Sequence, residues 1–245
     1  MLAVLKTVLY IPLYNGLIFL IWLIPGSSVA VAVVLFTILV KLLLFPLSYK
    51  ASKFQFEMRM HEGEIAQIKE RYKTDKQAEG KAVLDFYRTK KINPFAGILP
   101  IFIQIPLIIA LYYVFYGGGL PSIDPSLLYH GIPIPTPDMH SFGFDIGAKS
   151  IALAVLTALT QFLQAHFAMP PQKPRVAGTP ASFGDDMARG MQFQVKYILP
   201  VFIGFVAYQV SGAVALYFIT SNLFAVGQEV YLRKRLARET HLTHA

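Results

Sequence analysis

VAVAVVLFTILVKLLLFPLSYK, residues 29–50, is an apolar run with one cation, Lys41, well inside it. Its length is close to the roughly 20 apolar residues that cross a bilayer as a helix. A charge within such a helix costs about 2.5–3.5 kcal/mol on insertion scales, so its presence needs a physical reason. The long stem of Lys41 could reach toward the polar end of the run, or Lys41 could belong to a functional polar site. This helix alone leaves both interpretations open.

The composition places the chain in a membrane. Of its 245 residues, 55% are hydrophobic and 15% are charged, which is more apolar than a soluble domain. The long uninterrupted apolar runs predict helices, because strands of a membrane barrel alternate over about ten residues. The chain has no cysteine, which excludes disulfides, thiol chemistry and a lipid-modified cysteine. We therefore predict an all-α polytopic membrane protein.

Five apolar runs predict five transmembrane helices, near residues 29–47, 94–116, 148–168, 191–210 and 213–231. Residues 1–25 admit three interpretations: a signal peptide, a full span or an interfacial amphipathic helix. We favour the interfacial helix because Pro12 and Asn15 interrupt the run, and because its Tyr and Trp residues prefer headgroup level. The expected organisation is thus an interfacial helix over 1–25 and a five-helix core over 26–245.

The basic residues are concentrated in three polar segments. Residues 48–93 contain eleven of the 22 Lys and Arg residues, and two stretches with apolar positions at helical spacing predict a helical hairpin. The 170–190 loop and the 232–245 tail are also basic, whereas 117–147 contains three Asp and no Lys or Arg. The positive-inside rule then places the N-terminal side outside and the C-terminus in the cytoplasm of a plasma (inner) membrane protein. The net charge of +8 reflects topology and lipid contact, and DNA is not an expected partner.

Polar residues recur at helical spacing on several spans. The simple explanation is hydrogen bonding between helices, at about 0.6–2 kcal/mol per pair, and it is favoured for any single Thr or Ser. Glutamines and a lysine spread over several spans favour a shared polar cavity instead. Apart from Glu229 at the end of the last predicted span, the predicted spans contain no Asp or Glu to pair with Lys41, which also argues against a proton pump. The predicted groove residues are Lys41, Thr37, Gln104, Tyr112, Thr160, Gln161, Gln164, Tyr217, Ser221 and Asn222.

Enzymatic motifs are missing from the sequence. It contains no P-loop, GxSxG or HExxH pattern, and its six histidines are scattered. We predict no catalytic residues, no metal site and no cofactor, and we do not expect an enzyme.

Three segments resemble the YidC family of membrane protein insertases, in a compact form without the large extracytoplasmic domain. They are VKLLLFPLSYKASKFQFEMRM (40–60), KINPFAGILPIFIQIPLIIALYY (91–113) and SGAVALYFITSNLFAVGQE (211–229). The resemblance implies a groove that is open to the cytoplasm and to lipid, with hydrophilic residues around one basic residue. Lys41 stands where the family usually has arginine, so the charge is kept while the bidentate fork is lost. Gln161 and Gln164 are assigned to the groove only from their helical face.

The resemblance also implies partners. Nascent membrane proteins and membrane lipid are expected, and the Sec translocon and a ribosome docked at the basic tail are further candidates. Two other functions stay open at this point. One is a small-molecule transporter or channel with Lys41 as an anion site, although no internal repeat supports it. The other is a structural subunit in which Lys41 pairs with a carboxylate of another protein.

Overall fold

The computed structural model describes residues 6–93, 109, 113–114, 120–141, 143–169 and 189–243. Within these ranges the regular structure is helical, apart from the two-residue strands β1 (His140–Ser141) and β2 (Phe144–Asp145), which pair antiparallel. The predicted all-α polytopic fold is therefore confirmed. The chain divides into two compact units, Met1–Leu42 with Pro106–Glu229 and Leu43–Ile105 with Val230–Ala245.

The first unit begins with a π-helical turn, η1 (Lys6–Tyr10), that continues into α2 (Ile11–Leu23). Together they are long and apolar enough to cross a membrane. One side of α2 is buried, with Tyr14 and Leu17 fully enclosed, and from Val8 onward the exposed side chains are apolar as well. We expected an amphipathic helix over residues 1–25, but residues 8–23 present no polar face. Its placement in the interface stays a prediction.

Helix α3 (Val29–Leu43) follows a short turn, η2 (Pro25–Ser27). Gly26 has φ 76°, a left-handed conformation that glycine adopts without a steric penalty. The span that we predicted over 29–47 is two helices, because α3 ends at Leu43 and α4 (Phe45–Met60) begins two residues later. Pro46 explains the break, since proline lacks an N–H and its ring clashes with the carbonyl four residues earlier.

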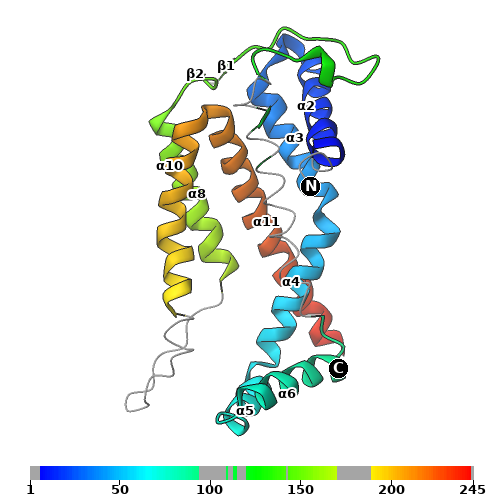
Figure 1. Ribbon diagram of the computed structural model, residues 1–245, viewed down its shortest axis with the longest axis vertical. Helices are drawn as coiled ribbons and strands as arrows, with labels where there is room; N and C mark the ends of the chain where they lie inside the picture. Colours follow the sequence, from blue (N-terminus) through cyan, green and yellow to red (C-terminus); the bar gives the residue numbers. More distant parts are fainter. Residues whose placement is uncertain are drawn as a thin grey trace. The chain divides into compact units, whose positions relative to one another are not determined.

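Three further helices match the predicted spans: α8 (Ile151–Ala168), α10 (Leu199–Val210) and α11 (Gly212–Thr243). A π-helical segment, η5 (Gln194–Ile198), precedes α10, so that Arg189–Val210 is one span-length helix. Helices α8 and α10 lie side by side (Figure 1), so closely that a Cβ at Gly204 would lie 2.9 Å from the Cβ of Ala158. The predicted span 94–116 lies outside the described residues, apart from positions 109, 113 and 114.

Residues 138–141 and 143–148 contact the beginnings of α3 and α11. The Asp138 N–H donates to the Ser27 carbonyl and the Asp138 carbonyl accepts from the Val29 N–H, both at 3.0 Å. The Gly212 N–H donates to the Ala148 carbonyl at 2.9 Å, and the Ala213 N–H donates to the Ile146 carbonyl at 2.8 Å. The same segment then leads into α8, which begins at Ile151. These hydrogen bonds link the beginnings of α3 and α11, and α8 begins three residues after Ala148.

Helix α2 is tied to the loop that precedes this segment. The Tyr14 hydroxyl accepts a hydrogen bond from the Asp124 N–H at 2.8 Å. The Asn15 side chain donates to the Leu127 carbonyl at 2.8 Å and accepts from the Tyr129 N–H at 2.7 Å. Buried polar groups need such partners. Asn15, which interrupts the apolar run in the sequence, thus links α2 to the loop through hydrogen bonds.

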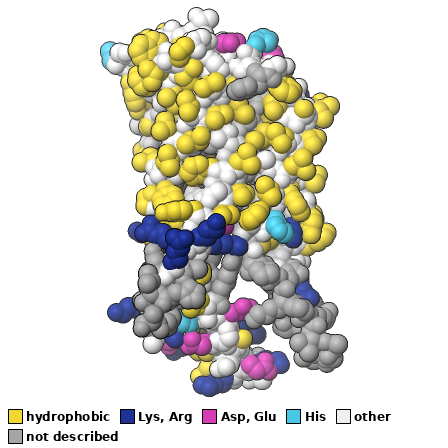
Figure 2. All heavy atoms as spheres, turned by 180° about the vertical axis from the view of Figure 1, so that it is seen from behind, with side chains coloured by type: hydrophobic (Ala, Val, Ile, Leu, Met, Phe, Trp, Pro, Cys, Tyr) yellow, Lys and Arg dark blue, Asp and Glu magenta, His cyan; other side chains and the backbone are white. Residues whose placement is uncertain are grey.

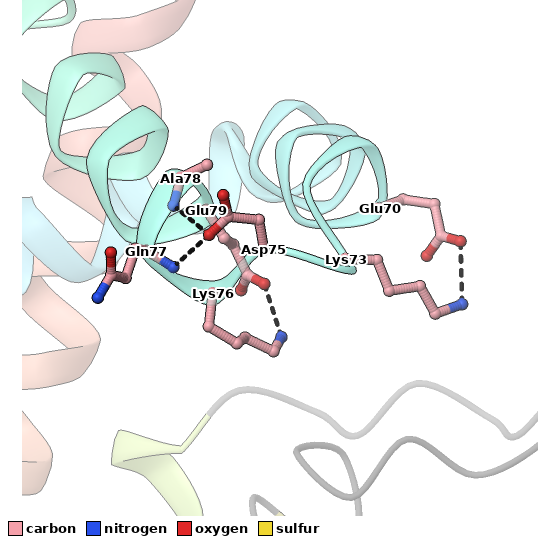
Figure 3. Close-up of polar contacts among 7 residues, drawn as sticks. All are labelled: Glu70, Lys73, Asp75, Lys76, Gln77, Ala78 and Glu79. Atoms are coloured by element: carbon pink, nitrogen blue, oxygen red, sulfur yellow. Dashed lines mark hydrogen bonds and ion pairs between the residues drawn. The ribbon is translucent and has the colours of Figure 1, made fainter.

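The second unit contains α4, α5 (Glu62–Arg71) and α6 (Lys76–Thr89). Helices α5 and α6 form a hairpin, and Asp75 caps α6 by accepting from the N–H groups of Gln77 and Ala78, each at 3.0 Å (Figure 3). The end of α11 belongs to this unit from Val230 onward. The basic residues after Val230 continue α11 as far as Thr243, and Arg235 lies 5.4 Å from the Tyr49 ring of α4.

Candidate substrate groove

The predicted polar residues of α3, α8 and α11 lie at similar distances from the beginnings of their helices. At a rise of about 1.5 Å per residue, Lys41 lies about 18 Å from the start of α3. Gln161 and Asn222 each lie about 15 Å from the start of α8 and α11. Each of these side chains therefore lies about half the thickness of a 30 Å hydrocarbon core away from the first residue of its own helix.

Lys41 occupies the last turn of α3 and is partly buried. One turn earlier, Thr37 is 2% exposed, and its hydroxyl donates to the Val33 carbonyl at 2.6 Å. The ion pairs of the described residues do not include Lys41. The one carboxylate in the predicted span sequences is Glu229, near the end of the last span, and the ion pairs of the described residues do not join it to Lys41. Lys41 is therefore a cation at membrane depth without an acidic partner among the described residues.

Two threonines join α8 to α11. Thr160 accepts a hydrogen bond from the Asn222 side-chain amide at 3.3 Å and donates to a carbonyl of its own helix at 3.0 Å. Thr157 is fully buried, and its hydroxyl lies 2.9 Å from the Leu153 carbonyl and 3.2 Å from the Ala215 carbonyl of α11. The interhelical explanation thus accounts for these side chains. Thr157 was absent from the predicted groove residues, although its spacing of three residues from Thr160 is a usable signal.

The glutamines of α8 have a different environment. The Gln161 amide donates to the Gln164 side-chain oxygen at 3.1 Å, and both residues are only partly buried. Each primary amide has two donors and an acceptor, so this pair keeps hydrogen-bonding capacity for a substrate or water. On α11, Tyr217 and Ser221 are 3% and 4% exposed, which places them inside the helix packing. Gln104 and Tyr112 lie outside the described residues.

These features define a multi-pass helical membrane protein with polar side chains on several of its apolar helices. A family model described as "60Kd inner membrane protein" matches residues 22–239. Relatives named "Membrane protein insertase YidC" from Francisella tularensis subsp. novicida (strain U112), subsp. holarctica (strain LVS) and subsp. tularensis (strain SCHU S4 / Schu 4) are each 31% identical over 211 residues. That alignment covers 86% of this chain and 33% of each relative, so the chain spans about a third of their length.

The chain therefore belongs to the 60Kd inner membrane protein family, which is the family of the YidC insertases. The resemblance stated from three sequence segments is confirmed over nearly the whole chain. The family and the span-length apolar helices together indicate that the chain is a multi-pass protein of the plasma membrane.

Proposed function

We propose that this protein is a membrane protein insertase that moves short polar flanks of nascent membrane proteins through a hydrophilic groove and releases their apolar segments into lipid. The observation that carries the proposal is Lys41, a cation in the last turn of the apolar helix α3 with no acidic partner among the described residues. A permanent partner would neutralise it, whereas a free cation is available to a substrate. The family and the names of the relatives support the same function.

The physical mechanism rests on shortening the apolar barrier. A polar flank that crosses about 30 Å of hydrocarbon leaves its hydrogen bonds unsatisfied over that whole distance. A hydrated polar layer at mid-depth leaves only about half of the distance to cross, and Lys41 attracts acidic residues of the flank. Because the cation stays partly hydrated, the contact is weak enough to release them. The membrane potential favours outward movement of acidic flanks by about 2.3 kcal/mol per charge at 100 mV.

The proposed groove residues have different roles in this mechanism. Lys41, Gln161 and Gln164 offer polar groups to the substrate, because they are partly buried and retain hydrogen-bonding capacity. Thr160 and Asn222 hold α8 against α11 and so keep the wall of the groove in place. Thr37, Gln104, Tyr112, Tyr217 and Ser221 complete the proposed lining.

Topology and partners follow from the same proposal. The α5–α6 hairpin and the basic end of α11 lie in the cytoplasm, and the N-terminal side lies outside. The hairpin receives the nascent chain, and the tail docks the ribosome through Arg233, Lys234 and Arg238, with Arg235 held on Tyr49. The Sec translocon is a further proposed partner. Catalytic chemistry plays no part, since substrate binding and the membrane potential supply the driving force.

The test is complementation of insertase-depleted cells with variants of Lys41. We expect Lys41→Ala to lower the insertion of clients with acidic flanks and Lys41→Arg to preserve it. Lys149→Ala is the matched control, because Lys149 lies at the beginning of α8 and donates to Gln209 at 2.9 Å. If Lys41→Ala inserted every client normally, the positive charge of Lys41 would have no role in insertion.

Photocrosslinking tests the function itself. Probes placed in α3 and α11 should capture nascent membrane proteins during their synthesis. A transporter or a structural subunit would give no such adducts, and a transporter would show solute flux in proteoliposomes. Lack of adducts at every probe position would overturn the insertase proposal.

A further inference from the structure

Helix α4 and the end of α11 lie side by side within the second unit (Figure 1). The Phe45 and Tyr231 rings are 6.3 Å apart, measured between centroids, and the Arg235 guanidinium lies 5.4 Å from the centre of the Tyr49 ring. From the first contact to the second, each helix advances by four residues, which is about one turn. Both advance toward higher residue numbers, so the two helices are parallel here.

Each helix exposes a lysine beside these contacts. On α11, Lys234 is exposed, whereas Leu232 and Leu236 are 0% and 4% exposed. The two leucines lie two residues before and after Lys234, so that the lysine is on the opposite side of the helix at about 100° per residue. On α4, Lys50 is exposed, whereas Ala51 is 4% exposed. Both lysines therefore lie on the outer surface of the pair.

Lys50 and Lys234 lie on the same side of the α4–α11 pair. Lys50 follows Tyr49 by one residue, and Lys234 precedes Arg235 by one residue. One residue is a rotation of about 100° around a helix. Opposite rotations on two parallel helices that face each other lead to the same side. Lys50 and Lys234 therefore flank the contact between Tyr49 and Arg235, and we call these four residues the basic face.

The carboxylates of α4 and α11 leave this charge in place. Neither lysine of the basic face takes part in the ion pairs of the described residues. On α4, Glu57 pairs with Lys53 at 3.9 Å. On α11, Glu229 and Glu239 lie five residues before and after Lys234, which places both positions about 140° around the helix from it. The basic face is therefore a surface of net positive charge.

The basic face lies at the end of an apolar stretch. The part of α11 that is long and apolar enough to cross a membrane is Gly212–Leu236, and the helix continues to Thr243. Lys234 is thus in the last turn of that stretch. Figure 2 shows Lys and Arg side chains gathered directly beside the apolar surface. Aromatic rings and basic side chains at the end of a span are typical of the level of lipid headgroups.

We propose that the basic face binds the phosphates of anionic phospholipids, with one headgroup at each lysine. Charge complementarity selects the anionic lipid, because each basic residue near a membrane surface gains about 1 kcal/mol from anionic headgroups. Bound lipid then fixes the end of α11 and the helix that leads into the α5–α6 hairpin at the membrane surface. The inference does not depend on the insertase proposal. Lys234 also belongs to the proposed ribosome contact, so the test is made without ribosomes.

The single tryptophan of the chain supplies a control reporter. Trp22 is 46% exposed near the end of α2, and residues 7–40 contain no charged residue. In a chain that combines Trp22→Phe with Tyr231→Trp, the tryptophan instead lies one turn before Arg235. Each protein is reconstituted in vesicles of equal parts phosphatidylcholine and phosphatidylglycerol. One of the two lipids is brominated in turn, and the quenching gives the relative association of each lipid with the reporter.

At the Tyr231→Trp reporter we expect phosphatidylglycerol to be preferred about fivefold, which corresponds to about 1 kcal/mol for one lysine near a membrane surface. The Trp22 reporter should show no preference. Lys50→Gln combined with Lys234→Gln should abolish the preference, and replacing both lysines by arginine should keep it. Arg233→Gln is the matched control, because it removes one charge from the side of α11 that faces away from α4, and most of the preference should remain. Equal preference at both reporters, or a preference that survives the double glutamine variant, would overturn the site.

Discussion

The chain contains two helical hairpins that are held together by different physics. In the α8–α10 pair, Gly204 lets the backbones approach closely, and large apolar side chains such as Phe205 remain exposed. In the α5–α6 pair, Ile65 is the one buried residue of α5 and α6 has none. This second pair depends on caps and surface ion pairs such as Lys90 with Glu64 at 3.0 Å.

The difference shows what each solvent requires. Burying apolar side chains gains no hydrophobic free energy in lipid, so helices in a bilayer associate through complementary shape and close backbone approach. Water does reward burial, and a hairpin with few buried residues keeps only the small contributions of exposed ion pairs, each about 0–1 kcal/mol. We therefore expect the α5–α6 hairpin to open more easily than the α8–α10 pair.

The largest expected effect is the loss of close approach in the α8–α10 pair. In Gly204→Ala, the new Cβ would lie 2.9 Å from the Ala158 Cβ and 3.0 Å from the Ala154 carbonyl oxygen, so the helices must separate. We expect the free energy of unfolding in mixed detergent micelles to fall by about 1–3 kcal/mol. Gly227→Ala in α11 is the control, because no atom lies within 4 Å of that position. Equal stabilities of the two variants would contradict the packing argument.

A smaller effect is expected from the cap of α6. Asp75→Ala removes the acceptor of two backbone N–H groups and should destabilise the hairpin by about 1 kcal/mol. Hydrogen exchange of the Gln77 and Ala78 amides should accelerate, while exchange in α8 stays unchanged. Asp75→Ser, which retains a capping oxygen, should keep most of the protection. Unchanged exchange in Asp75→Ala would show that the cap is dispensable.

The opposite sign is expected at Gly80, in the interior of α6. No atom lies within 4 Å of a Cβ at this position, so Gly80→Ala meets no obstacle. The gain in helix propensity should stabilise α6 by about 0.5–1 kcal/mol and slow the exchange of its amides. Set beside Gly204→Ala, the same chemical change should stabilise one hairpin and destabilise the other. Destabilisation by both substitutions would contradict the difference in packing that we infer for the two hairpins.

The smallest effect is the pH dependence of the α5–α6 contact. The hydrogen bond from His61 at 2.7 Å, followed by that from Lys90, holds the pKa of Glu64 below its usual value. A lowered pKa in the folded state adds stability above the ordinary pKa of glutamate, and this stability is lost as the pH falls through the lowered value. The protection factors of the α5 amides, which are exchange rates corrected for their intrinsic pH dependence, should therefore fall in acid, and Glu64→Gln should weaken this response. An identical acid response in Glu64→Gln would exclude Glu64 as its source.

The sequence predicted the helical class because each long apolar run can satisfy its backbone in lipid only as a helix. The break after Leu43 was visible in Pro46, yet an apolar run of sufficient length outweighed that signal. Helical spacing placed Thr160 and Gln161 on one face, but spacing does not reveal the neighbouring helix. The structure shows that Thr160 bonds to Asn222 whereas Gln161 bonds within α8. The same limit applied to Asn15, whose partners are remote in the sequence.

The remote partners of Asn15 have a consequence for how the protein itself is made. The Leu127 carbonyl and the Tyr129 N–H lie 112 and 114 residues further along the chain. Until the ribosome has synthesised those residues, the Asn15 oxygen has no protein donor from that loop, and burying it unpaired costs about 1–3 kcal/mol. Helix α2 is synthesised early, but its hydrogen bonds to the loop form late. During biogenesis, Asn15 in α2 therefore gains its hydrogen-bond partners from the loop only after residues 127 and 129 have been synthesised.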